Sequence, residues 1–295
     1  MVTLSTPTAV LSAVERARDV TFAAYLLPDG AMREALEAAA RAGATVHVRL
    51  ESQPYGDGAR DIADENKEAI KELRHARIDA RSTLAGENWL HLKAVVCDGV
   101  AYLDDRNFAA HGAQTVVCDD SKGDAEKVLD AILRDDTGSS LRFSTSKWDG
   151  LKKEAALIRE AHRGDTVEVA SEFFSGCAVS VALRAAAHRG VHCKLEVGDQ
   201  KHRKPQAITM LRNLAADGVE IRIGKTAEKF AVLDRCRAWI GSANATYGWE
   251  TERDWSIRTS NEDIARAVHR NFVDVWREGK AVRPSAKTIA ARFAS

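Results

Sequence analysis

The sequence predicts an α/β protein made of two similar halves, each an α/β/α sandwich, related to each other by a pseudo-twofold axis. Two observations predict this fold class. Apolar runs of strand length alternate with segments of helical periodicity along the chain, and the same order of elements occurs twice. We place the halves at residues 1–143 and 144–295. The repeat is far longer than a solenoid unit, so it indicates two fused domains and not an array.

The first half begins with a buried strand and continues with alternating helices and strands. Its expected elements are a strand over 20–27, a helix over 32–43, a strand over 45–51, a helix over 63–76 and a short strand over 77–82. Gly43 marks the end of the first helix, because glycine adopts the backbone conformation that follows a helix. Residues 119–140 hold a closing helix and a polar linker.

The second half repeats this order. Its expected elements are a strand over 166–174, a helix over 179–190, a strand over 191–197, a helix over 205–218, a short strand over 221–224 and a closing helix over 261–276. Alternating helices and strands imply right-handed crossovers and a mostly parallel or mixed sheet with both faces covered.

The composition is that of a globular protein, with 45% hydrophobic and 29% charged residues among 295. The formal net charge is zero, so no global basic field attracts nucleic acid or anionic lipid, and anion binding needs a local cluster. We expect no signal peptide, because the first residues lack a basic start and a continuous apolar run. We also expect no stable membrane insertion, because no apolar stretch approaches roughly 18 residues. The five cysteines show no CxxC spacing, which favours reduced core thiols in the cytoplasm.

One motif of histidine, lysine and aspartate occurs in both halves. Residues 91–98 read HLKAVVCD, and residues 227–234 read AEKFAVLD, with alanine in place of histidine. The shared positions are His91, Lys93 and Asp98 in the first copy and Ala227, Lys229 and Asp234 in the second. The residues that follow are Asn107 in the first half and Gly241, Ser242 and Asn244 in the second.

Such a pattern suits displacement at phosphorus. If a pseudo-twofold axis brings two histidines together, one can attack to form a phosphohistidine while the other protonates the leaving oxygen and later activates water. Paired lysines with Asn and Ser side chains would hold the non-bridging oxygens. This scheme needs neither a metal nor a cofactor, and the sequence shows no carboxylate cluster with metal-ligand spacing.

These residues resemble the signature of the phospholipase D superfamily, H-x-K-x-x-x-x-D followed by G-S-x-N, and the resemblance covers nearly the whole chain. It implies two phospholipase D-like halves that share one active site. It also implies His91 as the nucleophile and Lys93 and Lys229 as phosphate ligands. Asn107, Gly241, Ser242 and Asn244 would complete the pocket, and Asp98 and Asp234 would support the structure near it.

In many members of that family a carboxylate about twenty residues beyond the motif aspartate orients each histidine. The resemblance makes Asp119 or Asp120 the candidates in the first half, and Asp254 or Glu252 in the second. An orienting carboxylate fixes the tautomer of the ring and stabilises the imidazolium form.

The sequence departs from the signature at two places. Asp104 and Asp105 stand where Gly-Ser is expected in the first half and bring negative charge towards a phosphate site. Ala227 removes the expected general acid. Because the frame around Ala227 is otherwise intact, we expect an engineered His-to-Ala change, with natural loss as the alternative.

The predicted function is metal-independent hydrolysis or transfer of a phosphodiester, impaired by Ala227. We favour nucleic acid over phospholipid as the substrate, because a cytoplasmic chain suits nucleic acid, although the neutral net charge argues the other way. The alternatives are a phospholipase D or phosphatidyltransferase acting on phospholipid, and a natural pseudoenzyme that binds a phosphodiester or a partner without turnover.

Overall fold

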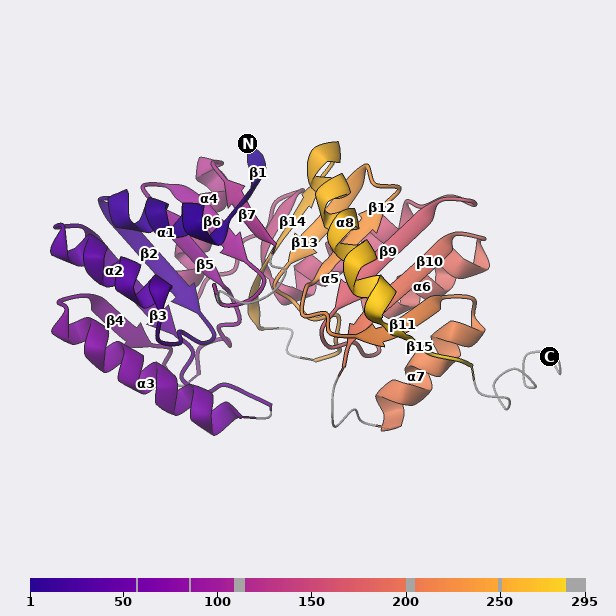
Figure 1. Ribbon diagram of the computed structural model, residues 1–295, viewed down its shortest axis with the longest axis horizontal. Coiled ribbons are helices and arrows are strands. Elements are labelled where there is room, and N and C mark those ends of the chain that lie inside the picture. Colours follow the sequence, from indigo (N-terminus) through magenta and orange to yellow (C-terminus); the bar gives the residue numbers. More distant parts are fainter. Residues whose placement is uncertain (57, 85, 109–114, 200–204, 249–250, 285–295) are drawn as a thin grey trace. The chain divides into compact units, whose positions relative to one another are not determined.

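A computed structural model describes residues 1–284 apart from 57, 85, 109–114, 200–204 and 249–250. The chain forms two compact units (Figure 1). The first unit consists of Met1–Gly150 and Trp249–Ser256, and the second of Leu151–Gly248 and Ile257–Ser295. The segment Trp249–Ser256, which the sequence prediction gave to the second half, therefore belongs to the first compact unit. Its assignment matters because it carries residues of the candidate site.

The first unit contains a seven-stranded sheet in the order β1-β7-β6-β5-β2-β3-β4. The strands are β1 (Val2–Ser5), β2 (Asp19–Ala24), β3 (Thr45–Leu50), β4 (Asp79–Ser82), β5 (Ala94–Cys97), β6 (Val100–Asp104) and β7 (Val116–Asp119). β2, β3 and β4 are parallel, whereas β5 pairs antiparallel with both β2 and β6. The sheet is therefore mixed, as the alternation of helices and strands predicts.

Helices cover both faces of this first sheet. The four helices of the unit are α1 (Pro7–Arg16), α2 (Ala31–Arg41), α3 (Ala59–His75) and α4 (Lys122–Leu133). Residues of α1, α2 and α3 share one hydrophobic core with Val20, Phe22 and Ala24, which alternate along β2. α4 packs against β2, β5 and β6, but its buried residues lie outside that core. This arrangement is the predicted α/β/α sandwich.

The second sheet has eight strands in the order β15-β11-β10-β9-β12-β13-β14-β8. The strands are β8 (Phe143–Ser146), β9 (Thr166–Ser171), β10 (His192–Gly198), β11 (Glu220–Gly224), β12 (Phe230–Leu233), β13 (Arg237–Gly241), β14 (Arg253–Thr259) and β15 (Lys280–Ala281). β9, β10 and β11 are parallel, and β12 pairs antiparallel with both β9 and β13. The order β11-β10-β9-β12-β13 thus repeats the order β4-β3-β2-β5-β6, which confirms the predicted repeat.

The helices of the second unit also pack in two groups. They are α6 (Ala178–His188), α7 (Pro205–Ala216), α8 (Glu262–Glu278) and α5 (Lys147–Arg159), whose residues up to Gly150 belong to the first unit. α5, α6 and α7 contribute to one hydrophobic core, and α8 packs against β9, β12 and β13. Within the described residues, no helix is both long and apolar enough to cross a membrane.

The structure shortens some predicted elements and adds others. The first predicted strand, 20–27, ends at Ala24 in the structure, although Tyr25 and Leu27 are buried. The apolar run continues there because those side chains pack in the interior after the chain has left the sheet. α1 and α5 are helices that the sequence did not predict. α5 contains Gly150, which lowers helix propensity.

Candidate active site

His91 has two buried carboxylates beside one of its ring nitrogens. Its Nδ1 lies 2.8 Å from Asp254 Oδ1 and 3.5 Å from Glu252 Oε1. Both carboxylate side chains are 1% exposed, whereas the imidazole retains 11% exposure. All three residues belong to the first unit. The ring is therefore oriented through Nδ1, so the neutral tautomer with Nδ1–H has its lone pair on Nε2.

Backbone pairing places Asp254 beside His91. Leu90 and Arg253 form a parallel bridge, in which His91 N donates to Arg253 O at 3.0 Å and Arg253 N donates to Trp89 O at 2.7 Å. Side chains alternate along an extended segment, so Glu252 and Asp254 share the side opposite to Arg253. The alternation explains why two carboxylates reach the same imidazole.

The side chain of Arg253 fixes this segment from its other side. Its buried guanidinium donates to Ala131 O at 2.9 Å and to Asn88 O at 2.7 Å, and lies 3.2 Å from Asp135 Oδ1. Burial lowers the pKa of Arg253, and the neighbouring carboxylates, first that of Asp135, oppose that shift. A buried arginine that lies outside any sequence motif thus holds the segment with the two carboxylates.

Two further residues bind Glu252. Lys147 Nζ donates to Glu252 Oε2 at 2.6 Å, and the Tyr55 hydroxyl donates to Glu252 Oε1. Burial raises the pKa of Tyr55 well above its usual value, and the charges of Glu252 and Asp254 raise it further, so the phenol stays protonated. Sequence reasoning missed both residues, because neither lies in a motif and both act on His91 through Glu252.

The carboxyl of Asp254 stays ionised. Burial raises its pKa, but the charge that His91 carries when it is protonated, its hydrogen bond, and the charges of Lys93 and Lys147 outweigh burial and hold the pKa below the usual 3.8. An ionised Asp254 can accept the Nδ1–H of a neutral imidazole and can also stabilise the imidazolium. This geometry allows His91 to act as a nucleophile or as an acid–base group.

Lys93 lies beneath the histidine and is 2% exposed. Its Nζ donates to His91 O at 2.5 Å and lies 5.7 Å from the centre of the Tyr25 ring. The Tyr25 ring also contacts the imidazole edge to face, with the ring centres 5.2 Å apart. Burial raises the pKa of Tyr25 to about 12. Lys93 therefore contributes a positive charge beside a phenol that stays protonated at physiological pH, and this charge also acts on Asp254.

The second motif keeps the lysine geometry without the histidine. Lys229 Nζ donates to Ala227 O at 2.7 Å, as Lys93 does to His91 O. Lys229 Nζ also lies 3.1 Å from Glu172 Oε2, and the side chains are 4% and 34% exposed. Glu172 follows β9 at the position where Tyr25 follows β2. The lysine of the second motif thus has a carboxylate partner where that of the first has an aromatic ring.

The two motif asparagines also occupy equivalent places. Asn107 Oδ1 accepts the amide of Leu26 at 3.3 Å, and Asn244 Oδ1 accepts the amide of Phe173 at 3.0 Å. Gly241 N donates to Lys229 O at 3.1 Å, as Asp104 N does to Lys93 O at 2.9 Å. Ser242, next to Gly241, is fully buried. These contacts align Asp104 and Asp105 with the Gly-Ser of the second copy.

The motif aspartates bind the starts of the neighbouring strands. Asp98 accepts the amides of Arg18 and Asp19 at 3.0 and 2.9 Å, and Asp234 accepts the amide of Thr166 at 2.8 Å. Both have a φ of 48° in the turn between two antiparallel strands. Aspartate tolerates this left-handed conformation better than most residues. These side chains hold the motif strand in register with its neighbour.

Asp119 and Asp104 contact groups other than the His91 ring. Asp119, a candidate from the sequence for orienting a histidine, is bound by Arg142 at 3.0 Å and accepts the amide of Ser121. The histidine of the first motif is oriented instead by Asp254, from the segment after the second motif. Asp104 accepts the amide of Phe108, and its carbonyl accepts Trp255 Nε1–H at 2.7 Å.

His91, Glu252 and Asp254 have potential metal-ligand atoms within 4.8 Å of one another. Their donor atoms already have other partners, since Nδ1 binds Asp254 and both oxygens of Glu252 accept hydrogen bonds. The buried ammonium of Lys147 already compensates the negative charge of Glu252, as a bound metal cation would otherwise do. The donor set therefore fits an oriented histidine better than a metal centre.

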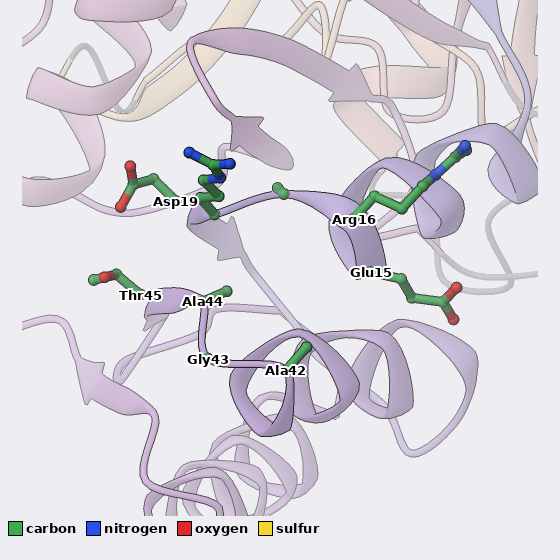
Figure 2. A pocket seen from close by; sticks show the side chains of 9 residues that line it. Glu15, Arg16, Asp19, Ala42, Gly43, Ala44 and Thr45 are labelled. Carbon is green, nitrogen blue, oxygen red and sulfur yellow. The ribbon is translucent and has the colours of Figure 1, made fainter.

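The first unit has two cavities. One of about 490 Å³ lies at the amino ends of β2 and β3, lined by Arg16, Arg18, Asp19 and their neighbours (Figure 2). His91 is near the opposite ends of these strands, which Tyr25 and Tyr55 follow. A second cavity, of about 320 Å³, is bordered by Asn107 and Phe108. Ligands of α/β sheets bind outside the carboxyl ends of strands, which favours the His91 side.

Comparison with known proteins agrees with this fold. Residues 155–276 match the family model described as "Cardiolipin synthase, PLD-like domain". The whole fold is similar to that of phosphatidylserine synthase from Haemophilus influenzae Rd KW20, with a TM-score of 0.68 and 10% identity over 96% of this chain and 88% of that one. Residues 155–276 are thus identified as a phospholipase D-like domain, and the solved structure shares the fold of the chain.

Two further solved structures are similar to this phospholipase D-like chain. Polyphosphate kinase from Porphyromonas gingivalis has a TM-score of 0.67 and 14% identity over 100% of this chain, which spans 55% of the kinase. Nuc from Salmonella typhimurium, a phospholipase D family member, has a TM-score of 0.40 and 21% identity over 44% of this chain and 88% of that one. No curated protein matches the sequence.

Proposed function

We propose that this phospholipase D-like chain cleaves a phosphodiester through a covalent phosphohistidine on His91. The observation that carries the proposal is the 2.8 Å contact between His91 Nδ1 and the buried Asp254, on a ring that remains partly exposed. A histidine fixed through Nδ1 by a carboxylate is held in the tautomer that attacks through Nε2.

The proposed reaction has two steps. In the first, a P–Nε2 bond forms and the bond from phosphorus to the leaving oxygen breaks, so that oxygen needs a proton. In the second, water or another hydroxyl attacks phosphorus, its proton passes to solvent because position 227 offers no base, and the P–Nε2 electron pair returns to His91. Lys93 and Lys229, with the asparagines and Ser242, are the proposed ligands of the non-bridging oxygens, where negative charge is greatest. That both motifs act on one phosphodiester is a prediction from the sequence.

Ala227 limits this reaction. The missing histidine would protonate the leaving oxygen, and loss of such a general acid typically costs about a hundred- to ten-thousand-fold in rate, or roughly 3–5 kcal/mol of barrier. The intact Lys229–Ala227 contact is consistent with one substitution in a working frame. We propose that a histidine at position 227 belongs to the fully active enzyme.

The proposed substrate is nucleic acid, on the sequence grounds given above. The description of the matching family model favours phospholipid as the second candidate. A labelled oligonucleotide titrated across a salt series separates them, because binding to nucleic acid weakens steeply with salt. A phospholipid substrate would instead respond to the head group and to vesicle composition.

A pseudoenzyme is supported by one specific observation. Glu172 pairs with Lys229 at the motif that lacks its histidine, so the second unit has lost both a catalytic group and part of its positive charge. A pseudoenzyme predicts ligand binding without turnover and no gain from Ala227→His.

The direct test of the proposed function is hydrolysis of bis-p-nitrophenyl phosphate with and without EDTA. We expect slow turnover that EDTA leaves unchanged and that His91→Gln abolishes. His75→Gln, an exposed histidine at the end of α3 in the same unit, is the matched control and should keep the wild-type rate. Turnover that survives His91→Gln, or that requires a divalent metal, would contradict the mechanism.

A further inference from the structure

The carboxylates at His91 create an electrostatic problem for a nucleophile. Asp254 and Glu252 lie 2.8 and 3.5 Å from the same Nδ1, and both are almost fully buried. Two negative charges in a low-dielectric environment stabilise the protonated form of a neighbouring imidazole. An imidazolium has no lone pair and cannot attack phosphorus, so one of the two charges needs compensation.

Lys147 supplies that compensation. It is the first residue of α5 and is 3% exposed, and its Nζ lies 2.6 Å from Glu252 Oε2. Its backbone amide also donates to Glu252 O at 3.1 Å, so the main chain and the side chain hold the same residue. The Tyr55 hydroxyl donates to the other oxygen, Oε1, which is the oxygen that faces His91. Glu252 is therefore a neutralised and oriented carboxylate.

We propose that Lys147 is a positioning residue that keeps the His91 imidazole uncharged, and so nucleophilic, by neutralising Glu252 while leaving Asp254 to orient the ring. This inference rests on the proposed role of His91. With Lys147 in place, the net negative charge facing the ring is that of one carboxylate. The tautomer is then fixed by the hydrogen bond to Asp254.

The other charged and titratable groups around the ring do not replace Lys147. Lys93 donates to the carbonyl of His91, and its charge acts on Asp254. Tyr25 and Tyr55 contact the ring as neutral phenols, at centre-to-centre distances of 5.2 and 6.2 Å. Glu51 accepts the amide of Leu90 at 2.6 Å, behind the histidine. Lys147 is the cation that forms a buried ion pair with Glu252, at 2.6 Å.

Two substitutions should move the protonation of His91 in opposite directions. Lys147→Met leaves Glu252 uncompensated, so the ring should hold its proton to higher pH. Glu252→Gln removes that negative charge and leaves the ammonium, so the ring should lose its proton at lower pH. In each case we expect a displacement of at least about one pH unit, a tenfold change in the protonation equilibrium.

The experiment is an NMR titration of the histidine ring nitrogens in the full chain, with His91 assigned by its loss in His91→Gln. The midpoint for His91 should rise in Lys147→Met and fall in Glu252→Gln. Lys122→Met, an exposed lysine on α4, is the control and should leave the midpoint unchanged. The ascending limb of the pH–rate profile on an activated phosphodiester should move with the NMR midpoint.

A double variant tests the inference even if Lys147→Met does not fold. Lys147→Met leaves a buried carboxylate without its cation and can unfold the unit. Lys147→Met with Glu252→Gln removes both charges, and its midpoint should return to within about half a pH unit of the wild type. The inference is overturned if the two single variants shift the midpoint in the same direction or not at all. It is also overturned if the double variant, folded by circular dichroism, stays displaced. The titration needs no turnover. An inactive protein would contradict the proposed function, but the shift of the His91 midpoint would still be measured.

Discussion

Asp254 Oδ1 lies 2.8 Å from His91 Nδ1, although 163 residues separate them along the chain. The carboxylate that orients the histidine of the first motif thus comes from the segment that follows the second motif. That segment belongs to the first compact unit, through the pairing of Arg253 with Leu90. A short segment from the second sequence repeat therefore supplies the carboxylates beside the histidine of the first.

Asp254→Asn should lower kcat/KM by about a hundred- to ten-thousand-fold at neutral pH. The asparagine amide keeps the shape of the side chain but removes the charge, and it can favour the tautomer in which Nε2 carries the proton. Steady-state kinetics with bis-p-nitrophenyl phosphate measures the loss. Asp64→Asn, on the exposed side of α3, is the control and should stay within about twofold of the wild type. An Asp254→Asn variant of wild-type activity would remove this aspartate from the mechanism.

Ala227→His should raise turnover according to the leaving group. An alkyl phosphodiester needs a proton on its leaving oxygen, so we expect a gain of about a hundred- to ten-thousand-fold. A p-nitrophenyl ester needs little assistance and should gain much less. Comparing both esters on the two proteins measures the difference. Equal gains would mean that position 227, and not His91, carries the nucleophile.

Glu172→Gln should strengthen anion binding by the second unit. Glu172 competes for Lys229 Nζ at 3.1 Å, so its neutralisation leaves the ammonium for a phosphate oxygen. We expect inorganic phosphate to bind roughly tenfold more tightly, about 1.4 kcal/mol. Calorimetric titration measures the affinity, with Glu278→Gln at the exposed end of α8 as the control. Unchanged or weaker binding would show that Glu172 does not limit this pocket.

The buried Glu154 should make the protein less stable as the pH rises. Burial raises its pKa from 4.5 to about 8. Its folded-state pKa exceeds its unfolded value, so the folded protein binds the extra proton between these values. Stability is therefore highest below about pH 4.5 for this group and falls by about 1.4 kcal/mol per pH unit up to about pH 8. Burial also raises the pKa of Glu196 to about 7. Through this group too, stability falls as the pH rises, over a narrower pH range.

Urea unfolding at pH 5.5 and 7.5 tests this dependence. Between these pH values, Glu154 alone should cost about 2–3 kcal/mol of unfolding free energy. Glu154→Gln should remove that part of the difference, whereas Glu220→Gln on β11, where the glutamate is exposed, should keep it. If Glu154→Gln has the wild-type pH dependence, the carboxyl is already ionised in the folded protein.

Much of the fold follows from local patterns in the sequence. The alternation of strands and helices, the repeat and the motif strands were predicted, because each is encoded by apolar periodicity over a few residues. The start of α5 was not predicted, since Gly150 and a run of lysines weaken its amphipathic pattern. The end of β2 was placed three residues late, because buried side chains continue beyond the last strand residue.

The candidate site was only partly predictable. His91 and Lys93 stand in a recognisable signature, but the carboxylate partner of His91 depends on which segments pair in space. Spacing assigned Asp119 or Asp120 to His91 and Asp254 or Glu252 to the second motif, whereas the Leu90–Arg253 bridge places Asp254 beside His91. Lys147 and Tyr55 act on the histidine through Glu252, so no local pattern marks them.

The central claim is that His91 is the nucleophile, and detection of its phosphorylated form tests it most directly. An activated phosphodiester should be mixed with the full chain, quenched in base within the first turnovers and analysed by mass spectrometry. We predict a phosphoryl adduct on His91 that is stable in base, labile in acid and absent from His91→Gln. A chain that turns over the ester with no adduct on His91, or with an adduct on another residue, would contradict the mechanism.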